Sequence, residues 1–144
     1  MNKESMPLII NGGQFSDERG TISYFNDLDL SPVKRMYIIA HTDTSTVRAW
    51  QGHKQEHKWF HVLAGSFKMV LIKPDNWEFP STDLGYQDYN LTDKNNEVLH
   101  VPGGYATGFK ALEANSRLLV FSNFTVSESQ NDDFRFDKNN WYNW

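Results

Sequence analysis

The sequence predicts an all-β protein with the architecture of a jelly roll, and three observations lead to this prediction. Its apolar stretches are short and rich in β-branched and aromatic residues, which favours strands. Turn signals recur roughly every 8–12 residues, a spacing typical of sandwiches and jelly rolls. Helical patterning is scarce, so a turn or two of helix is expected only in residues 80–89 or in the C-terminal tail.

The expected strands share alternating or continuous apolar patterns bounded by Gly, Pro, Asn or Asp. In chain order they lie within residues 18–27, 33–41, 47–53, 58–64, 66–73, 97–101, 105–109 and 116–126. Tight turns are expected at Asp17–Gly20, at Ala64–Ser66 and at the Pro-Gly-Gly of residues 102–104. The long polar loop of residues 73–88 contains aromatic side chains of the buried type, so we expect it to pack over the barrel.

Composition limits the possible classes of protein. A length of 144 residues without repeats suits one domain, residues 1–144, and 15% aromatic residues suffice for a core. The absence of cysteine excludes disulfides and thiolate metal sites. No stretch approaches the roughly 20 apolar residues of a membrane span, and the apolar run of residues 7–10 is too short for a signal peptide. We therefore expect a cytoplasmic location.

The charge pattern favours a small anionic ligand over a polyanion. The net charge of −4 argues against binding to nucleic acid. Basic residues nevertheless gather in the first 58 residues, whereas the segment SESQNDDFRFD near the end is acidic. A local basic pocket fits this distribution, although individual lysines are often simply solvated.

One stretch, residues 47–66, carries the spacing of a known motif. Residues two apart in a strand share a face, so Gln51 and His53 should project into the same cavity. The run from Gln51 through His53 and Lys58 to Gly65 resembles the first motif of the cupin superfamily, which has H-x-H, then a glutamate, then glycine. The segment VPGGYATGF resembles the second motif, with Thr107 at the histidine position. The resemblance implies a cupin jelly roll.

These replacements argue against a metal. A lysine ammonium at position 58 is a donor-only cation and would repel a divalent ion. Gln51 and Thr107 are poor ligands for transition metals beside one imidazole. We therefore expect no metal and no other cofactor, which excludes a metal-dependent oxygenase.

Within the cupins the sequence resembles the nucleotide-sugar branch, namely the dTDP-4-dehydrorhamnose 3,5-epimerases and the dTDP-sugar 3,4-ketoisomerases. The matching segments are spread over most of the chain and keep their order: DERG (17–20), VKRMYII (33–39), RAWQGHK (48–54), VLAGSFKMVL (62–71) and VPGGYATGFKAL (101–112). The resemblance implies a dTDP-4-keto-6-deoxyhexose as ligand, a place in deoxysugar biosynthesis and a homodimer, with an N-terminal strand that crosses to the partner.

The chemistry of these families begins with removal of a proton next to a ketone, which needs a base and a donor for the enolate oxygen. The resemblance places the base at Gln51, whose amide does not titrate near neutral pH. His53 and Tyr37 are the candidates to move the proton instead, and Lys58 is the candidate counter-charge of the enolate. Each has a structural alternative as a core or strand residue.

The remaining candidates are binding residues. Arg48 and Arg19 suit a diphosphate, because a guanidinium pairs two phosphate oxygens at once. Tyr105, or one of Trp50 and Trp59, is a candidate to stack on the nucleotide base. Gln51 and Thr107 can hydrogen-bond the sugar. Two functions stay open: an epimerase or ketoisomerase, and a catalytically impaired or non-catalytic cupin that binds the same nucleotide sugar. The C-terminal tail, with two tryptophans, is expected to pack on the barrel or across the dimer.

Overall fold

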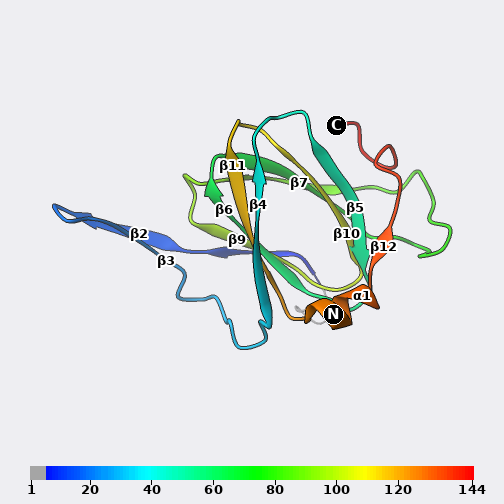
Figure 1. The fold of residues 1–144 in the computed structure, drawn as a ribbon, viewed down its shortest axis with the longest axis horizontal. Coiled ribbons are helices and arrows are strands. Elements are labelled where there is room, and N and C mark those ends of the chain that lie inside the picture. Colours follow the sequence, from blue (N-terminus) through cyan, green and yellow to red (C-terminus); the bar gives the residue numbers. More distant parts are fainter. Residues whose placement is uncertain (1–5) are drawn as a thin grey trace.

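A computed structural model describes residues 6–144 and confirms the all-β cupin-type jelly roll (Figure 1). The twelve strands and one short helix of the described residues follow in chain order: β1 Leu8–Asn11, β2 Gly13–Asp17, β3 Gly20–Tyr24, β4 Arg35–His41, β5 Val47–His53, β6 Lys58–Ala64, β7 Ser66–Ile72, β8 Gln87–Thr92, β9 Glu97–Val101, β10 Tyr105–Ala111, β11 Ser116–Ser122, α1 Val126–Gln130 and β12 Phe134–Arg135. One sheet has the order β1-β9-β6-β11-β4, the second has β12-β5-β10-β7-β8, and β2 pairs with β3.

The hydrophobic core lies between the two five-stranded sheets. Each strand sends alternate side chains inward, so β6 and β11 face β7 and β10 across the core. Its fully buried members include Phe60 and Leu118 from the first sheet and Phe67 and Met69 from the second. The predicted turn between β6 and β7 is confirmed, and it uses Gly65 at φ +77°, a conformation that side-chain-bearing residues rarely adopt.

The C-terminal tail covers the outer face of the second sheet. Trp141 and Trp144 pack edge-on or tilted against Trp50 with ring centroids 5.5 Å apart. Gly108 lies beneath them, where a Cβ atom would come within 2.8 Å of both Trp50 and Trp144. The expectation that the tail packs on the barrel is therefore confirmed.

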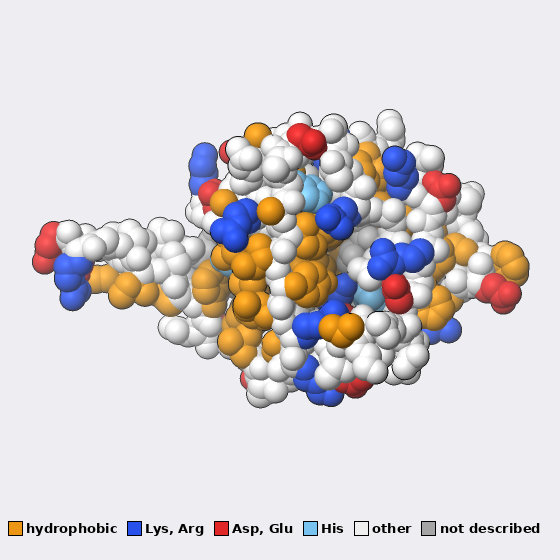
Figure 2. All heavy atoms as spheres, in the orientation of Figure 1, with side chains coloured by type: hydrophobic (Ala, Val, Ile, Leu, Met, Phe, Trp, Pro, Cys, Tyr) orange, Lys and Arg blue, Asp and Glu red, His pale blue; other side chains and the backbone are white. Residues whose placement is uncertain are grey.

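The outer face of the first sheet remains largely apolar. Met36 and Ile38 on β4 are 58% and 43% exposed, and they pair with Phe121 and Leu119 on β11. Figure 2 shows hydrophobic side chains gathered over this part of the molecule. The β2–β3 hairpin extends away from the barrel as a narrow arm (Figure 1).

The strand expected over residues 116–126 ends at Ser122, and its last expected residue, Val126, begins the helix α1. Residues 80–89 contain no helix; they form loop and the start of β8. The helix α1 instead follows β11, where Thr125 and Glu128 form a reciprocal capping box at its start. None of the helices in residues 6–144 is long and apolar enough to cross a membrane.

Candidate functional site

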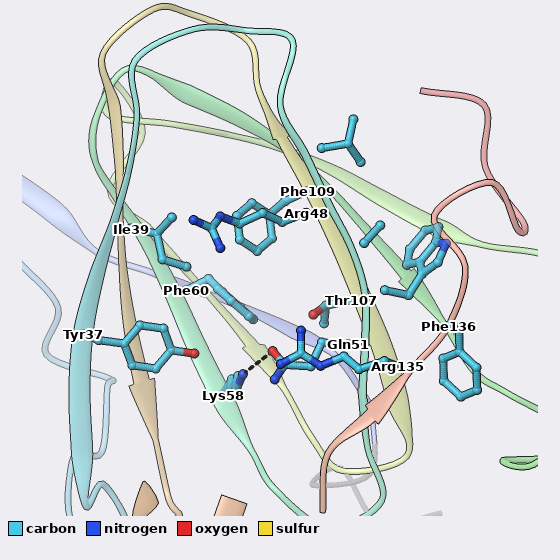
Figure 3. Close-up of a pocket in the computed structure, with 13 residues that line it drawn as sticks. Tyr37, Ile39, Arg48, Gln51, Lys58, Phe60, Thr107, Phe109, Arg135 and Phe136 are labelled. Atoms are coloured by element: carbon cyan, nitrogen blue, oxygen red, sulfur yellow. Dashed lines mark hydrogen bonds between the residues drawn. The ribbon is translucent and has the colours of Figure 1, made fainter. Parts of the chain in front are cut away.

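A cavity of about 500 Å³ opens between the two sheets (Figure 3). Its lining comes from four strands of the barrel and from the C-terminal segment: Tyr37, Ile39, Val47, Arg48, Ala49, Trp50, Gln51, Lys58, Phe60, Thr107, Phe109, Arg135 and Phe136. The antiparallel pairing of β5 with β10 sets Thr107 directly opposite Gln51. Three cationic side chains and no carboxylate belong to this lining, so the cavity favours an anionic ligand.

A chain of polar contacts runs along one wall of the cavity and is centred on Gln51. The Lys58 ammonium donates to Gln51 Oε1 at 3.1 Å, and Gln51 Nε2 donates to Asp133 Oδ1 at 3.2 Å. The same carboxylate accepts from Arg135 Nε at 2.8 Å and from its Nη2 at 3.3 Å. Burial raises the pKa of Asp133, but the hydrogen bonds from Arg135 and Gln51 outweigh this and lower it overall. The amide of Gln51 is thus fixed with its oxygen toward a cation and its nitrogen toward an anion.

Lys58 is 4% exposed, and a buried carboxylate beneath it balances its charge. Glu56, itself 1% exposed, accepts from Ser122 at 2.8 Å and from Ser129 at 2.6 Å. The Arg35 guanidinium lies 3.2 Å and the Lys58 ammonium 3.9 Å from Glu56 Oε2. Because a buried charge is costly unless it is paired, this cluster holds Lys58 in place with its ammonium at the cavity wall.

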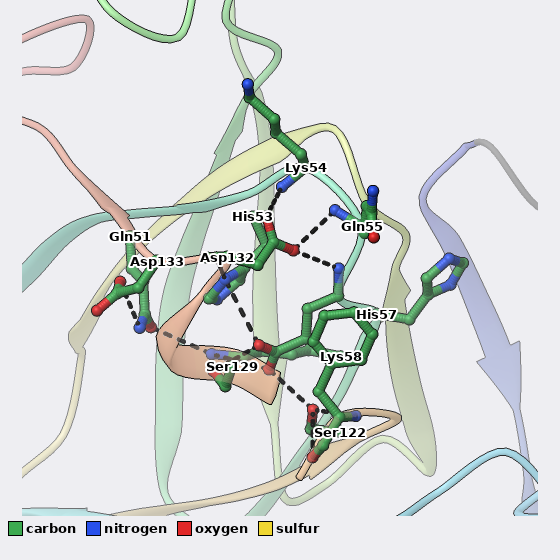
Figure 4. Close-up of polar contacts among 12 residues, drawn as sticks. Gln51, His53, Lys54, Gln55, His57, Lys58, Ser122, Ser129, Asp132 and Asp133 are labelled. Atoms are coloured by element: carbon green, nitrogen blue, oxygen red, sulfur yellow. Dashed lines mark hydrogen bonds and ion pairs between the residues drawn. The ribbon is translucent and has the colours of Figure 1, made fainter. Parts of the chain in front are cut away.

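The segment between β5 and β6 is shaped by one acidic residue from beyond α1 (Figure 4). The Asp132 carboxylate accepts the backbone N–H groups of Lys54, Gln55 and Glu56, each at 2.8 Å. Its backbone carbonyl accepts from His53 Nδ1 at 2.6 Å. The residue therefore ties the C-terminal segment to the loop that carries Glu56 into the interior.

His53 lies two residues beyond Gln51 on the same face of β5, opposite Tyr105. Because Nδ1 donates to the Asp132 carbonyl, the neutral ring keeps its lone pair on Nε2, which is buried and without a hydrogen-bond partner. Burial lowers the pKa of His53 below 6.5, and the positive charge of Lys58 lowers it further. The predicted shared face of Gln51 and His53 is present, but His53 is not among the residues that line the cavity.

Arg48 reaches the cavity from β5, and a buried histidine orients it. Its Nε donates to Nε2 of His41 at 3.0 Å, so that imidazole accepts and is neutral. Burial and the adjacent Arg48 charge both lower the pKa of His41. The guanidinium keeps its remaining N–H groups for a ligand and lies beside Phe109 in Figure 3.

Tyr37 enters the cavity from β4, and Figure 3 shows its hydroxyl directed toward Lys58. Two cations flank the ring: Arg35 lies 5.2 Å and the Lys58 ammonium 5.7 Å from its centroid. Cations near an aromatic face are stabilised by its quadrupole. Tyr37 and Lys58 therefore lie next to each other at the cavity wall.

The structure does not bring the other two sequence candidates to this cavity. Tyr105 is 7% exposed and belongs to the hydrophobic core, so its ring is not available to stack on a nucleotide base here. Arg19 lies at the tip of the β2–β3 hairpin, paired with Asp17 at 2.6 Å and with its side chain 79% exposed. In residues 6–144, no group of three or more His, Asp or Glu side chains could hold a metal ion.

Sequence reasoning missed the contribution of the C-terminal segment. Arg135 and Phe136 line the cavity because β12 pairs with β5, placing Arg135 opposite Gln51. The backbone N–H and C=O of Phe136 exchange hydrogen bonds with Trp50, both at 3.2 Å. The alternation in the sequence FRFD was the only local signal for this short strand.

Comparison with known proteins gives a consistent result. The family model FdtA, described as "WxcM-like, C-terminal", matches residues 5–142. A search of curated proteins found no match. Among solved structures, the chain is 22% identical to a double mutant of the QdtA 3,4-ketoisomerase from Thermoanaerobacterium thermosaccharolyticum in complex with TDP, covering 94% of this chain and 90% of that one with a TM-score of 0.71.

Two further structures have similar folds. The WlaRB TDP-quinovose 3,4-ketoisomerase from Campylobacter jejuni is 20% identical, with 90% and 92% of the two chains covered and a TM-score of 0.68. The dTDP-4-dehydrorhamnose 3,5-epimerase from Bacillus anthracis, with TDP and PPi bound, is 18% identical, with 96% and 83% covered and a TM-score of 0.72. These structural similarities show the fold, and the matching family model assigns the sequence to a family. The chain belongs to the WxcM-like, C-terminal family.

Proposed function

We propose that the cavity binds a dTDP-4-keto-6-deoxyhexose and that the protein acts on it as a metal-free 3,4-ketoisomerase or 3,5-epimerase. The observation that carries this proposal is the convergence of Arg48, Lys58, Tyr37 and Gln51 on one cavity with cationic and no acidic lining residues. The resemblance noted in the sequence and the printed ligands of the structural neighbours support the same ligand class.

The cavity supplies separate groups for the two ends of such a ligand. Arg48, oriented by His41, is suited to the diphosphate. The hydrogen-bonding groups of Gln51 and Thr107 stand opposite each other and are suited to the sugar ring. Lys58 then faces the ketone, where its ammonium stabilises the negative charge that develops on the enolate oxygen.

Among the described residues, the cavity lining contains no histidine or carboxylate that could serve as a general base for proton transfer. Among the lining residues, Tyr37 and Lys58 are the candidates for proton transfer, since arginine stays protonated and an amide does not titrate. His53 does not line the cavity, so it could act directly only if the ligand reached past Gln51 to the next residue pair of β5 and β10. We therefore expect slow turnover, in which Tyr37 acts in its phenolate form. It takes the proton from the carbon next to the ketone, becomes a neutral phenol and returns the proton to the enolate, while Lys58 holds the enolate oxygen.

A second function is favoured by the fixed amide of Gln51, which occupies the family's base position and is held by Lys58 and Asp133. In this alternative the protein binds the nucleotide sugar without transforming it. The two functions share the ligand and differ in whether a ring proton exchanges with solvent.

The deciding experiment incubates the protein with dTDP-4-keto-6-deoxyglucose in D₂O and follows deuterium at C3 and C5 by NMR. Exchange at C3 alone supports ketoisomerisation, and exchange at both carbons supports epimerisation. Binding of dTDP by calorimetry with no exchange at high protein concentration supports the binding function. Failure of both dTDP and the keto sugar to bind would contradict both proposals.

We also propose that the protein forms a homodimer through the outer face of the first sheet. Met36 and Ile38 are exposed apolar residues of that face, and the arm carries exposed Phe15 and Ile22. Large apolar patches of this kind are unusual on monomers. In such a dimer Arg19 would reach a ligand only in the neighbouring subunit. Sedimentation of the Ile38→Glu variant as a monomer, with the wild type as a dimer, is the expected result.

A further inference from the structure

We propose that Arg135 is a phosphate-binding residue of the cavity and that Asp133 positions it, so that the segment after α1 is part of the ligand site. This inference rests on the proposed function. Arg135 lines the cavity together with Arg48 and Lys58, although it lies 77 residues beyond Lys58 in the sequence.

The backbone of this segment is held firmly against β5. Phe134 and Arg135 pair with Gly52 and Gln51, and the next residue exchanges two backbone hydrogen bonds with Trp50. On the other side, the Asp132 carboxylate accepts three backbone N–H groups of the loop after β5. The Cα of Arg135 is therefore fixed relative to the cavity wall without any ligand.

The contact with Asp133 orients the Arg135 side chain but occupies only some of its N–H donors. The carboxylate accepts from Nε and Nη2, which leaves the other guanidinium N–H groups without an intramolecular partner among the described contacts. The side chain is 67% exposed, and Figure 3 shows it extending back toward Gln51 at the cavity. A solvent-accessible fork that is already oriented is what binding of two phosphate oxygens requires.

The charge balance of the cavity points to the same role. Each of its three cations has a neighbour. Lys58 lies beside buried Glu56, and Arg48 donates to a neutral histidine. Arg135 donates to Asp133, a carboxylate that it shares with Gln51. The lining holds no acidic residue, and the nearby carboxylates Glu56 and Asp133 are each shared between several partners, whereas Arg48 forms no ion pair among the described residues. A diphosphate between Arg48 and Arg135 would supply negative charge to Arg48, while uncharged thymidine would not.

The test measures the affinity of dTDP and of thymidine by calorimetry for the wild type, Arg135→Gln and Arg135→Lys. The matched control is Arg117→Gln, which removes the same charge from β11 outside the cavity. We expect Arg135→Gln to weaken dTDP binding by about tenfold to a hundredfold, since a charge-assisted hydrogen bond contributes on this scale. Arg135→Lys should fall between, because it keeps the charge but not the fork. Thymidine binding and the control should change by less than about twofold.

The possible outcomes distinguish a failure of the role of Arg135 from a failure of the proposed function. If the wild type binds dTDP and Arg135→Gln binds it equally well with an unchanged thermal midpoint, the role of Arg135 is overturned and the proposed function stands. If Arg135→Gln weakens dTDP and thymidine alike, the residue shapes the cavity without binding phosphate, which also overturns the inference. If the wild type binds neither ligand, both the inference and the proposed function fail.

Discussion

Replacing Gln51 with histidine is the change most expected to accelerate proton exchange. Gln51 already donates through Nε2 to Asp133 at 3.2 Å and accepts through Oε1 from Lys58 at 3.1 Å. A neutral imidazole in the same place can donate one ring N–H to Asp133 and keep its second nitrogen as an acceptor facing Lys58 and the cavity. The amide therefore holds the hydrogen-bonding pattern of a histidine but lacks the ability to titrate.

The expected gain follows from the usual contribution of a general base. A positioned base is worth about 10²–10⁴-fold, which corresponds to roughly 2.7–5.4 kcal/mol at 1.36 kcal/mol per tenfold change. We expect Gln51→His to raise the rate of deuterium entry at C3 of dTDP-4-keto-6-deoxyglucose by this factor. Its rate should also rise with pH through the range in which an imidazole loses its proton.

Two control variants test whether a titrating group at position 51 causes the gain. Gln51→Asn cannot titrate and should leave exchange at or below the wild-type rate. Adding Asp133→Asn to Gln51→His removes the carboxylate that orients the ring and should return part of the gain. If Gln51→His binds the substrate as tightly as the wild type but exchanges within about threefold of its rate, the missing base is not what limits this site, and the reasoning is refuted.

Three further predictions concern the groups around the cavity. Lys58→Gln should slow C3 exchange about 10²–10³-fold, the usual effect of losing one donor to a developing oxyanion, with the thermal midpoint measured in parallel to exclude unfolding. Glu56→Gln should lower the free energy of unfolding by about 3 kcal/mol in urea titrations because it leaves buried cations unpaired, whereas Glu18→Gln at the tip of the arm should change it little. Burial and the neighbouring His57 lower the pKa of His100 from 6.5 to about 4, so its neutral form stabilises the fold above pH 6.5. That stability is lost as the pH falls from 6.5 toward 4, and His100→Gln should flatten this part of the unfolding profile; an unchanged slope would contradict the assignment.

Local sequence patterns were enough to predict most strands of the barrel and one wall of the cavity, but they did not predict β1, β2, β8 or β12. The alternation in β5 set Gln51 and His53 on one face, and the cupin-like spacing brought Lys58 and Thr107 to Gln51. These relations depend on strand period and on hairpin pairing, which short stretches of sequence encode.

The opposite wall depends on contacts between distant segments. Arg135 pairs with Gln51 across 84 residues, and Asp132 caps a loop 76 to 78 residues earlier. A two-residue strand carries too little periodicity to be recognised, and a side-chain-to-backbone bond leaves no spacing rule in the sequence. The absence of His53 from the cavity lining could not be predicted either, because the period of a strand gives the face of a residue but not whether that residue borders the cavity.

The most direct test of the central claim is a crystal structure of the wild type with dTDP. We expect the nucleotide in the cavity between the sheets, with its diphosphate in contact with Arg48 and Arg135 and with His53 out of contact with the ligand. Density for dTDP elsewhere, or an empty cavity at saturating nucleotide, would contradict the account.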